Sequence, residues 1–215
     1  MSDVTRALDG IMDDVRAAFV AKNEAREKAL PLCREAIRFS ANAIRAVHRD
    51  EFELAEDLIA KAGAQLATAK QSLARHPDIF HAGFVHDAQK EYAEASITLA
   101  LIAGRPFPTP ASLDVELPAY LNGMGEAVGE LRRHLLDTLR AGDVDRCEAW
   151  LREMDDMYSA LVTVDYPDAM TGGLRRTTDN VRGILERTRG DLTLSLQQRR
   201  LEERLQEFAR RLGDA

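Results

Sequence analysis

The stretch IFHAGFVHDAQKEYAEASITLALIA (residues 79–103) has the pattern of one amphipathic helix. Its apolar residues recur every three or four positions, so at about 100° per residue they fall on a single arc of the helix surface. The arc consists of Phe80, Phe84, Ala88, Tyr92, Ala95, Leu99 and Ile102. The next segment, GRPFPTP (residues 104–110), must end the helix because proline lacks the backbone N–H that helical hydrogen bonding needs. We therefore predict a helix that buries one face.

The same periodicity continues along most of the chain. Ala, Leu, Arg and Glu dominate the composition, whereas Gly and Pro number only 13 and 7, which favours helices over strands. Pro31 is expected to kink or split the first helix. The predicted helical segments are residues 4–48, 51–76, 79–103, 114–141, 143–164, 174–190 and 191–212. We predict a single all-α domain (residues 1–215), a bundle of about seven long antiparallel helices.

Composition excludes several classes of protein. No apolar run approaches about 18 residues and MSDVTRALDG (residues 1–10) has no apolar signal segment, so we expect a cytoplasmic protein without membrane association. Cys33 and Cys147 lack metal-binding or redox spacing and are expected to be reduced core thiols. The net charge of −7 excludes a generally basic nucleic-acid-binding coat, but it permits a local cationic surface. The chain has no dinucleotide fingerprint, P-loop, HExxH or GxSxG motif.

Three carboxylates lie in the helix predicted over residues 79–103. Asp87 and Glu94 fall beyond one edge of the apolar arc, and Glu91 falls on its margin. A carboxylate at a buried margin costs several kcal/mol unless a cation, a metal or hydrogen-bond donors meet it. Two interpretations are open: a solvated face with a Lys90–Glu94 pair, or half of a metal site.

The helix predicted over residues 143–164 offers a further acid. Asp156 lies almost opposite the apolar stripe of this helix, and Asp155 lies to one side. Asp156 therefore faces either solvent or a cavity formed by assembly. A third carboxylate beside Glu91 and Glu94 would give the all-oxygen environment that Mg²⁺ or Mn²⁺ prefers.

The last predicted helix, within residues 191–215, is amphipathic. Leu201, Leu205, Phe208 and Leu212 recur at intervals of four, three and four. Such a stripe can pack on its own bundle or serve in oligomerisation, and the pattern leaves both possibilities open.

Arginines at helical spacing mark a candidate basic face on the first helix. Arg34, Arg38, Arg45 and Arg49 fall at intervals of four, seven and four. The alternative is a solvated face paired with nearby acids. Aromatic residues make up only 6% of the chain, so contacts with RNA would rest on phosphate charge rather than on base stacking. Further candidates for phosphate contact are Lys61, Lys70, Arg75, Arg175, Arg176 and Arg182.

Several segments, in order, resemble the translin and translin-associated factor X family. EYAEA (residues 91–95), ten residues after FH (80–81), resembles the segment of translin-associated factor X with two catalytic glutamates. LREMDDMYSAL (151–161) resembles the segment whose aspartate completes the acidic site, which aligns with Asp156. Other matching segments are LDVELPAYLNG (113–123), GELRR (129–133), AGDVDR (141–146) and LRRTTDNVRGILERTRGDL (174–192). The resemblance covers most of residues 30–195.

The resemblance implies a seven-helix fold that assembles into octameric shells and binds RNA or single-stranded DNA inside them. The glutamate pair implies the translin-associated factor X branch, which consists of Mg²⁺-dependent endoribonucleases. Glu91, Glu94 and Asp156 would then be the catalytic ligands of Mg²⁺ or Mn²⁺. Glu130 is a possible fourth ligand, or it pairs with Arg132 or Arg133.

Three functions are weighed on this basis. The first is a homo-oligomeric endoribonuclease that cleaves phosphodiester bonds with a carboxylate-held metal, with the octamer that the family resemblance implies. The second is a translin-like protein that binds RNA or single-stranded DNA without chemistry. The third is a helical scaffold for protein partners. His81 touches phosphate in the first case and is otherwise a structural residue.

Overall fold

The computed structural model describes residues 2–213 and consists of helices joined by short turns. Within these residues there are six long helices, three single-turn helices and no strand, so the predicted all-α class is confirmed. The long helices are α1 (Asp3–Val47), α2 (Phe52–Ser72), α4 (Gly83–Ile102), α6 (Leu117–Arg140), α7 (Val144–Val162) and α9 (Leu174–Gly213). The single-turn helices are α3 (Pro77–Phe80), α5 (Pro110–Leu113) and α8 (Asp168–Thr171).

Local chemistry explains where these helices begin and end. The Asp143 side chain accepts a hydrogen bond from the Arg146 N–H at 3.2 Å, as expected of the cap of α7. Gly104, Gly142 and Gly172 follow helices and adopt φ angles of 64°, 85° and 61°. This left-handed conformation ends a helix at little cost only when the residue lacks a Cβ atom.

The structure differs from the sequence prediction at three helices. Residues 79–103 are not one helix: α3 ends at Phe80, His81 and Ala82 form a turn, and α4 begins at Gly83. Helix α1 continues through Pro31, which is exposed, so water can bond to the carbonyl group that the proline leaves free. Residues 174–213 form one helix, α9, rather than two. Arg132 of α6 holds α9 on both sides of Gly190, because it donates hydrogen bonds to Thr188 (2.8 Å) and Asp191 (2.7 Å).

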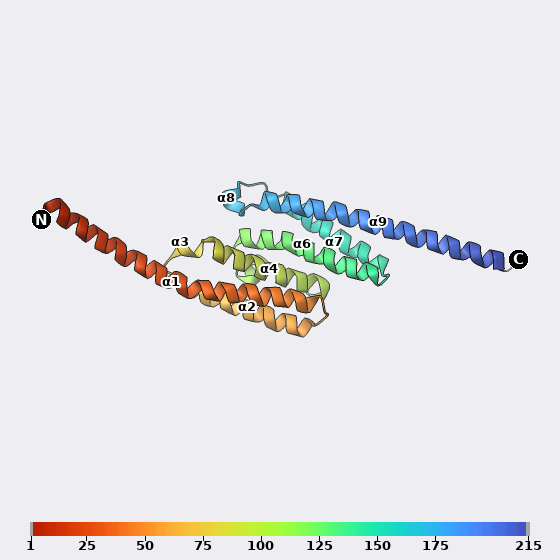
Figure 1. The fold of residues 1–215 in the computed structure, drawn as a ribbon, viewed down its shortest axis with the longest axis horizontal. Helices are drawn as coiled ribbons and strands as arrows, with labels where there is room; N and C mark the ends of the chain where they lie inside the picture. The colour runs from red at the N-terminus through yellow and green to blue at the C-terminus, as the bar shows by residue number, and fades with distance from the viewer. Residues whose placement is uncertain (1, 214–215) are drawn as a thin grey trace.

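The long helices pack in a layered bundle (Figure 1). Helix α4 packs against α1, α2 and α6, and α6 in turn packs against α7 and α9. The first half of α1 and the last half of α9 extend beyond the bundle at opposite ends of the molecule. No helix within residues 2–213 has the length and apolarity that crossing a membrane requires.

Helix α4 is more deeply buried than its sequence pattern predicts. Ala93, Ile97 and Ala100 lie outside the predicted arc, yet they are buried, because α6 covers the side of α4 that faces away from α2. The close approach of the two helices depends on Gly123 of α6. A Cβ atom there would lie 2.6 Å from the Lys90 carbonyl oxygen. This contact positions the acidic residues of α4 against α6.

Candidate metal centre

Three carboxylates from two helices meet where α4 and α6 cross. Glu91 and Glu94 lie one turn apart on α4, and Glu126 lies on α6, one turn beyond Gly123. One oxygen of each carboxylate lies within 4.8 Å of the others. The structure therefore brings the two predicted glutamates together and adds Glu126. We call these three residues the carboxylate cluster.

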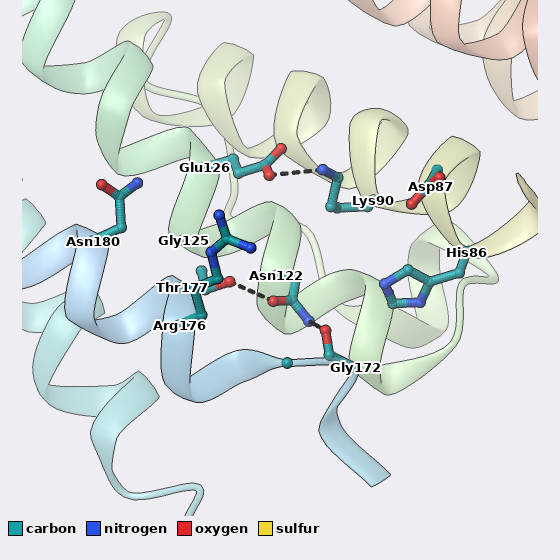
Figure 2. A pocket seen from close by; sticks show the side chains of 11 residues that line it. His86, Asp87, Lys90, Asn122, Gly125, Glu126, Gly172, Arg176, Thr177 and Asn180 are labelled. Atoms are coloured by element: carbon teal, nitrogen blue, oxygen red, sulfur yellow. Dashed lines mark hydrogen bonds and ion pairs between the residues drawn. The ribbon is translucent and has the colours of Figure 1, made fainter. Parts of the chain in front are cut away.

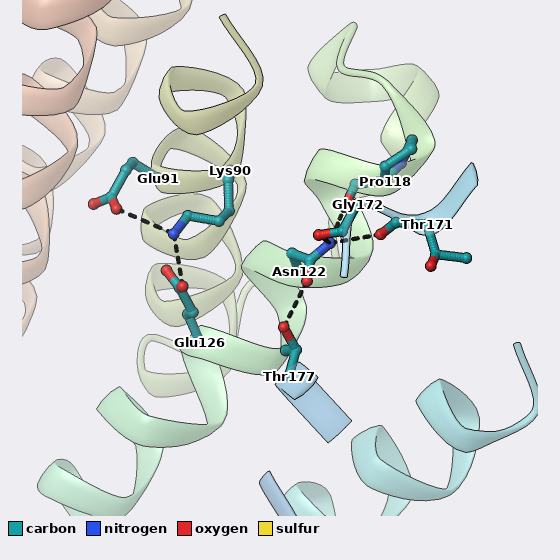
Figure 3. A network of polar contacts seen from close by, with 8 residues as sticks. All are labelled: Lys90, Glu91, Pro118, Asn122, Glu126, Thr171, Gly172 and Thr177. Atoms are coloured by element: carbon teal, nitrogen blue, oxygen red, sulfur yellow. Dashed lines mark hydrogen bonds and ion pairs between the residues drawn. The ribbon is translucent and has the colours of Figure 1, made fainter. Parts of the chain in front are cut away.

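Lys90 supplies a positive charge to the carboxylate cluster (Figure 3). Its Nζ donates a hydrogen bond to Glu126 at 2.7 Å and lies 3.7 Å from Glu91. The pair predicted between Lys90 and Glu94 is replaced by these contacts. The ammonium group thus occupies part of the space in which a cation would be bound.

Glu94 is the most deeply buried acid of the cluster. Only 8% of the residue is exposed, whereas its expected position was beyond the edge of the apolar arc. Burial, and then the negative charges of Glu126, Glu91 and Glu130, raise the pKa of Glu94 to about 8. Burial also raises the pKa of Glu91. A divalent cation would release the Glu94 proton and relieve the repulsion among the carboxylates.

The donor set fits a hard divalent cation. All three side chains present carboxylate oxygens, the ligands that Mg²⁺ and Mn²⁺ prefer over nitrogen or sulfur. The distances between the oxygens allow one ion to touch all three side chains. Lys90 would have to move aside when the ion binds.

Glu130 is paired with a histidine and an arginine, whereas a metal ligand needs a free carboxylate oxygen. The side chain of His48, which is 5% exposed, contacts it through Nε2 at 2.5 Å, and Arg133 lies 3.8 Å away. The hydrogen bond from His48 lowers the pKa of Glu130 despite partial burial. Of the two expected partners, Arg133 contacts Glu130, while Arg132 binds α9. Glu130 therefore lies beside the cluster as a paired carboxylate.

Asp156 does not join the cluster within one chain. It is exposed on α7, which packs against α6 and α9 through Trp150, Met154 and Leu161 on its opposite face. Within one chain the third acid of the cluster is therefore Glu126, and the role expected of Asp156 stays a prediction for a neighbouring copy of the chain. Asp155 pairs with Arg189 of α9.

Sequence reasoning missed Glu126, although a signal was present. Gly123, Gly125 and Gly129 give α6 a glycine-rich surface, which permits close helix contact. Cβ atoms at Gly123 and Gly125 would meet atoms of α4 and α9 within 3.0 Å, so these faces are in contact. An acid one turn beyond Gly123 must then face α4.

A cavity of about 670 Å³ opens beside the cluster (Figure 2). Lys90 and Glu126 form its boundary with the cluster, while His86 and Arg176 contribute further nitrogen atoms to its wall. On its floor, the Asn122 amide accepts a hydrogen bond from Thr177 (2.6 Å) and donates one to the Thr171 carbonyl (2.9 Å). These bonds fix the loop that carries Gly172 and Gly173, so the cavity has a rigid, polar lining.

His81 lies in a neighbouring hollow rather than at the cluster. It is exposed, packs edge-on against Phe80, and lines a cavity of about 440 Å³ together with His86 and Gln89. The two cavities share His86 and Gly172.

The predicted RNA-binding cations are scattered, and most are paired. Exposed pairs of this kind contribute little stability and can be exchanged for phosphate. Paired cations are Arg38 with Glu35, Arg45 with Asn42, Lys61 with Asp57, Lys70 with Asp114, Arg175 with Asp165 and Arg182 with Asp179. Arg34, Arg75 and Arg176 have no carboxylate within 4.0 Å in the described part of the chain. Among all these cations, Arg176 is the one that lines the large cavity.

Comparison with known proteins gives relatives over most of the chain. No family model matches. Uncharacterized protein MJ0175 of Methanocaldococcus jannaschii is 32% identical over 189 residues, which cover 86% of this chain and 82% of that protein.

Solved structures agree with this result. AfC3PO in complex with duplex RNA has a TM-score of 0.80 and 32% identity, covering 87% of this chain and 97% of that one. AfC3PO alone gives the same TM-score and identity, with 87% and 98% coverage. Apo-NeC3PO, at 18% identity and a TM-score of 0.76 over 86% of this chain and 96% of that one, shares the fold. The chain belongs to the family of the C3PO proteins, the translin and translin-associated factor X family.

Proposed function

We propose that this protein is a metal-dependent endoribonuclease that binds RNA and cleaves its phosphodiester bonds at the carboxylate cluster. The observation that carries the proposal is the juxtaposition of Glu91, Glu94 and Glu126 at the edge of a polar cavity. Lys90 and Arg176 line this cavity together with Asp87. The duplex RNA bound to AfC3PO, a relative of 32% identity, supports RNA as the ligand.

Glu91, Glu94 and Glu126 would hold Mg²⁺ or Mn²⁺. The ion, when bound, supplies a Lewis acid for the scissile phosphate and lowers the pKa of a water molecule that attacks it. Asp156 stays a candidate ligand only if a neighbouring copy of the chain supplies it. Glu130 stays a candidate only if it gives up its contact with His48.

The chain's own cations would position the RNA. Arg176 faces the cavity and is suited to bind a phosphate beside the cluster. Lys90, once displaced from Glu126, lies on the boundary between cluster and cavity and can reach the same phosphate. Asn122 holds the loop at residues 171–173 in place and keeps the cavity open for a nucleotide.

The test is incubation of labelled RNA with the protein in Mg²⁺ or in EDTA. We expect internal cleavage in Mg²⁺ only, and a loss of about a hundredfold or more in Glu94→Gln, the order of effect seen when a preorganised charged group is removed from an active site. The matched control is Asp155→Asn, since Asp155 pairs with Arg189 away from the cluster. Equal cleavage by wild type and Glu94→Gln would refute the proposal.

A second candidate function is binding of RNA or single-stranded DNA without cleavage. The position of Lys90 favours it, because the ammonium group already neutralises part of the cluster. RNA that binds equally in Mg²⁺ and EDTA and stays intact in both would select this function.

We also propose that the protein assembles as a homo-oligomer in the cytoplasm, with the octamer of the family as the expected state. Light scattering of the purified protein tests the assembly. The expected mass is far above the 23.9 kDa of one chain.

A further inference from the structure

Two helical arms project from opposite ends of the bundle (Figure 1). The N-terminal arm (residues 3–24) precedes Ala25, the first buried residue of the described chain, and the C-terminal arm (residues 193–213) follows Leu192, the last one. At 1.5 Å per residue each arm is on the order of 30 Å long. In proteins an amphipathic helix gains most of its stability from packing of its apolar face, and the apolar faces of the arms lie beyond the bundle.

Each arm carries an exposed apolar stripe with heptad spacing. Val4, Leu8, Ile11 and Val15 follow one another at intervals of four, three and four. On the C-terminal arm, Leu201, Leu205 and Phe208 continue from Leu194 at intervals of seven, four and three. Exposed fractions are 54% for Leu8, 56% for Ile11, 58% for Leu205 and 61% for Phe208. Leu212 continues the second stripe in the sequence, but its side chain lies outside the described residues.

The charges of the two arms are complementary. The N-terminal arm has five acidic and three basic side chains, and the C-terminal arm has five basic and three acidic ones. The residues are Asp3, Asp9, Asp13, Asp14, Glu24, Arg6, Arg16 and Lys22 on the first arm, and Arg199, Arg200, Arg204, Arg210, Arg211, Glu202, Glu203 and Glu207 on the second. Pairing of like arms would join two arms of the same net charge, whereas pairing of unlike arms joins net charges of −2 and +2.

We propose that the N-terminal arm of one copy of this chain pairs antiparallel with the C-terminal arm of a second copy. The arms lie at opposite ends of the molecule, so one two-fold rotation brings both unlike pairs together and closes the dimer. This inference rests on the proposed homo-oligomeric assembly, and it is independent of RNA cleavage.

The sequence pattern sets the register and direction of the pair. When the stripes are aligned antiparallel over their full length, Leu8 meets Phe208, Ile11 meets Leu205 and Val15 meets Leu201. The same register places Asp14 beside Arg204, both in the position that flanks the stripe.

The parallel arrangement lacks this pairing. When the stripes are aligned parallel over their full length, Val4 meets Leu201 and Ile11 meets Phe208. The flanking Arg204 then lies beside Met12 rather than beside Asp14, so the acid has no cationic partner. Charge therefore selects the antiparallel direction.

Cysteine cross-linking tests both the partner and the direction. Ile11→Cys and Leu205→Cys are prepared separately, mixed and exposed to a mild oxidant; the native Cys33 and Cys147 are buried. We expect a cross-linked species of twice the 23.9-kDa chain in the mixture, and little with either protein alone. The matched control is Val4→Cys mixed with Leu201→Cys, positions that meet in the parallel direction and lie 11 residues out of register in the antiparallel one, so this mixture should cross-link less. Stronger cross-linking in this control, or within Ile11→Cys alone, would overturn the proposal.

Charge reversal provides a second measurement that leaves the apolar stripes intact. Arg204→Glu should weaken the dimer several-fold in dilution light scattering, as should Asp14→Arg, and the combination of both should restore it. Circular dichroism verifies that each variant remains helical. A combination no better than the single variants, or a wild type that is monomeric at micromolar concentration, would contradict the pairing.

The arms could instead bind RNA or an anionic membrane, and the variant Leu205→Glu tests both alternatives. If this variant still assembles but no longer binds RNA, or no longer binds anionic vesicles, the C-terminal arm is an RNA-binding or a membrane-binding element, and the pairing is refuted. Glu94→Gln separates the two proposals, since it should lose cleavage while its assembly is unchanged. If the arms do not pair, the cleavage result still stands. If the protein does not cleave RNA, the result on arm pairing still stands.

Discussion

Glu126 and Glu130 lie one turn apart on α6, and the comparison between their surroundings explains the chemistry of this part of the molecule. Glu126 faces Glu91 and Glu94, and its cationic contact is Lys90, which it shares with Glu91. Glu130 accepts a hydrogen bond from His48 and has Arg133 nearby.

The difference appears in the protonation of the buried acids. In the carboxylate cluster, burial and mutual repulsion raise the pKa of Glu94 to about 8. At the second site, the His48 hydrogen bond lowers the pKa of Glu130. Burial alone therefore does not decide the charge of an acid; the partners present in the chain do. The cluster lacks enough positive charge for its three carboxylates, and a divalent cation would supply it.

The largest effect that would sharpen this comparison is the pH dependence of stability without metal. The folded chain keeps the Glu94 proton up to about pH 8, whereas the unfolded chain releases it near the ordinary value of 4.5. Between these pH values the folded state binds more protons, so the free energy of unfolding should fall as pH rises, by about a few kcal/mol. Denaturant unfolding in EDTA at pH 5 and pH 8 measures the change. Glu94→Gln should remove most of this slope, and a slope that survives in this variant would show that another group causes it.

The next effect is that Glu→Gln substitutions at the two sites should change the free energy of unfolding in opposite directions. At pH 7 without metal, Glu94→Gln should raise the free energy of unfolding, because the neutral amide folds without the proton that the buried Glu94 must take up. Glu130→Gln should lower it by about 2 kcal/mol, the typical contribution of a hydrogen bond to a charged group. The Glu130 contribution is present above the pKa of the unfolded chain and is lost as the pH falls through the lower pKa of the folded one. Two changes of the same sign would remove the distinction between the sites.

Much of this fold was predictable from local sequence signals. The prolines of residues 104–110, the glycine at 142 and the cap at Asp143 act on neighbouring backbone groups, so they set helix ends in any context. The proximity of Glu91 and Glu94 was also predictable, since helix geometry places residues three apart on one side.

The rest depended on which helices meet. Glu126 joins the cluster because Gly123 lets α6 approach α4, and Glu94 is buried because α6 covers it. Asp156 lies apart from the cluster because α7 packs mainly against α6 and α9, with Asp156 on its exposed face. The continuity of α9 likewise depends on Arg132, a residue 42 positions before its start at Leu174. Periodicity within one segment carries none of this information.

A third, smaller effect concerns the affinity for the metal. Lys90→Met keeps most of the side-chain volume but removes the ammonium group that competes with a divalent ion at Glu91 and Glu126. We expect Mg²⁺ to bind about tenfold more tightly, which corresponds to about 1.4 kcal/mol. Calorimetric titration of RNA-free protein measures it. Arg133→Met, at the Glu130 site, is the matched control and should leave the affinity unchanged. Weaker Mg²⁺ binding in Lys90→Met would mean that Lys90 positions the ligands rather than competing with the ion.

The smallest effect separates the cavity beside the cluster from the outer surface of α9. Arg176 and Arg182 are both exposed on α9, but Arg176 lines the cavity, whereas Arg182 pairs with Asp179. Each phosphate contact releases about one counterion, so Arg176→Gln should reduce the slope of log affinity against log salt by about 0.7 to 0.9. Arg182→Gln should leave that slope unchanged. RNA binding is measured from 50 to 200 mM salt in EDTA, so that cleavage cannot contribute. Equal slopes for the two variants would mean that the RNA does not bind in the cavity. The scissile phosphate would then not lie beside the carboxylate cluster.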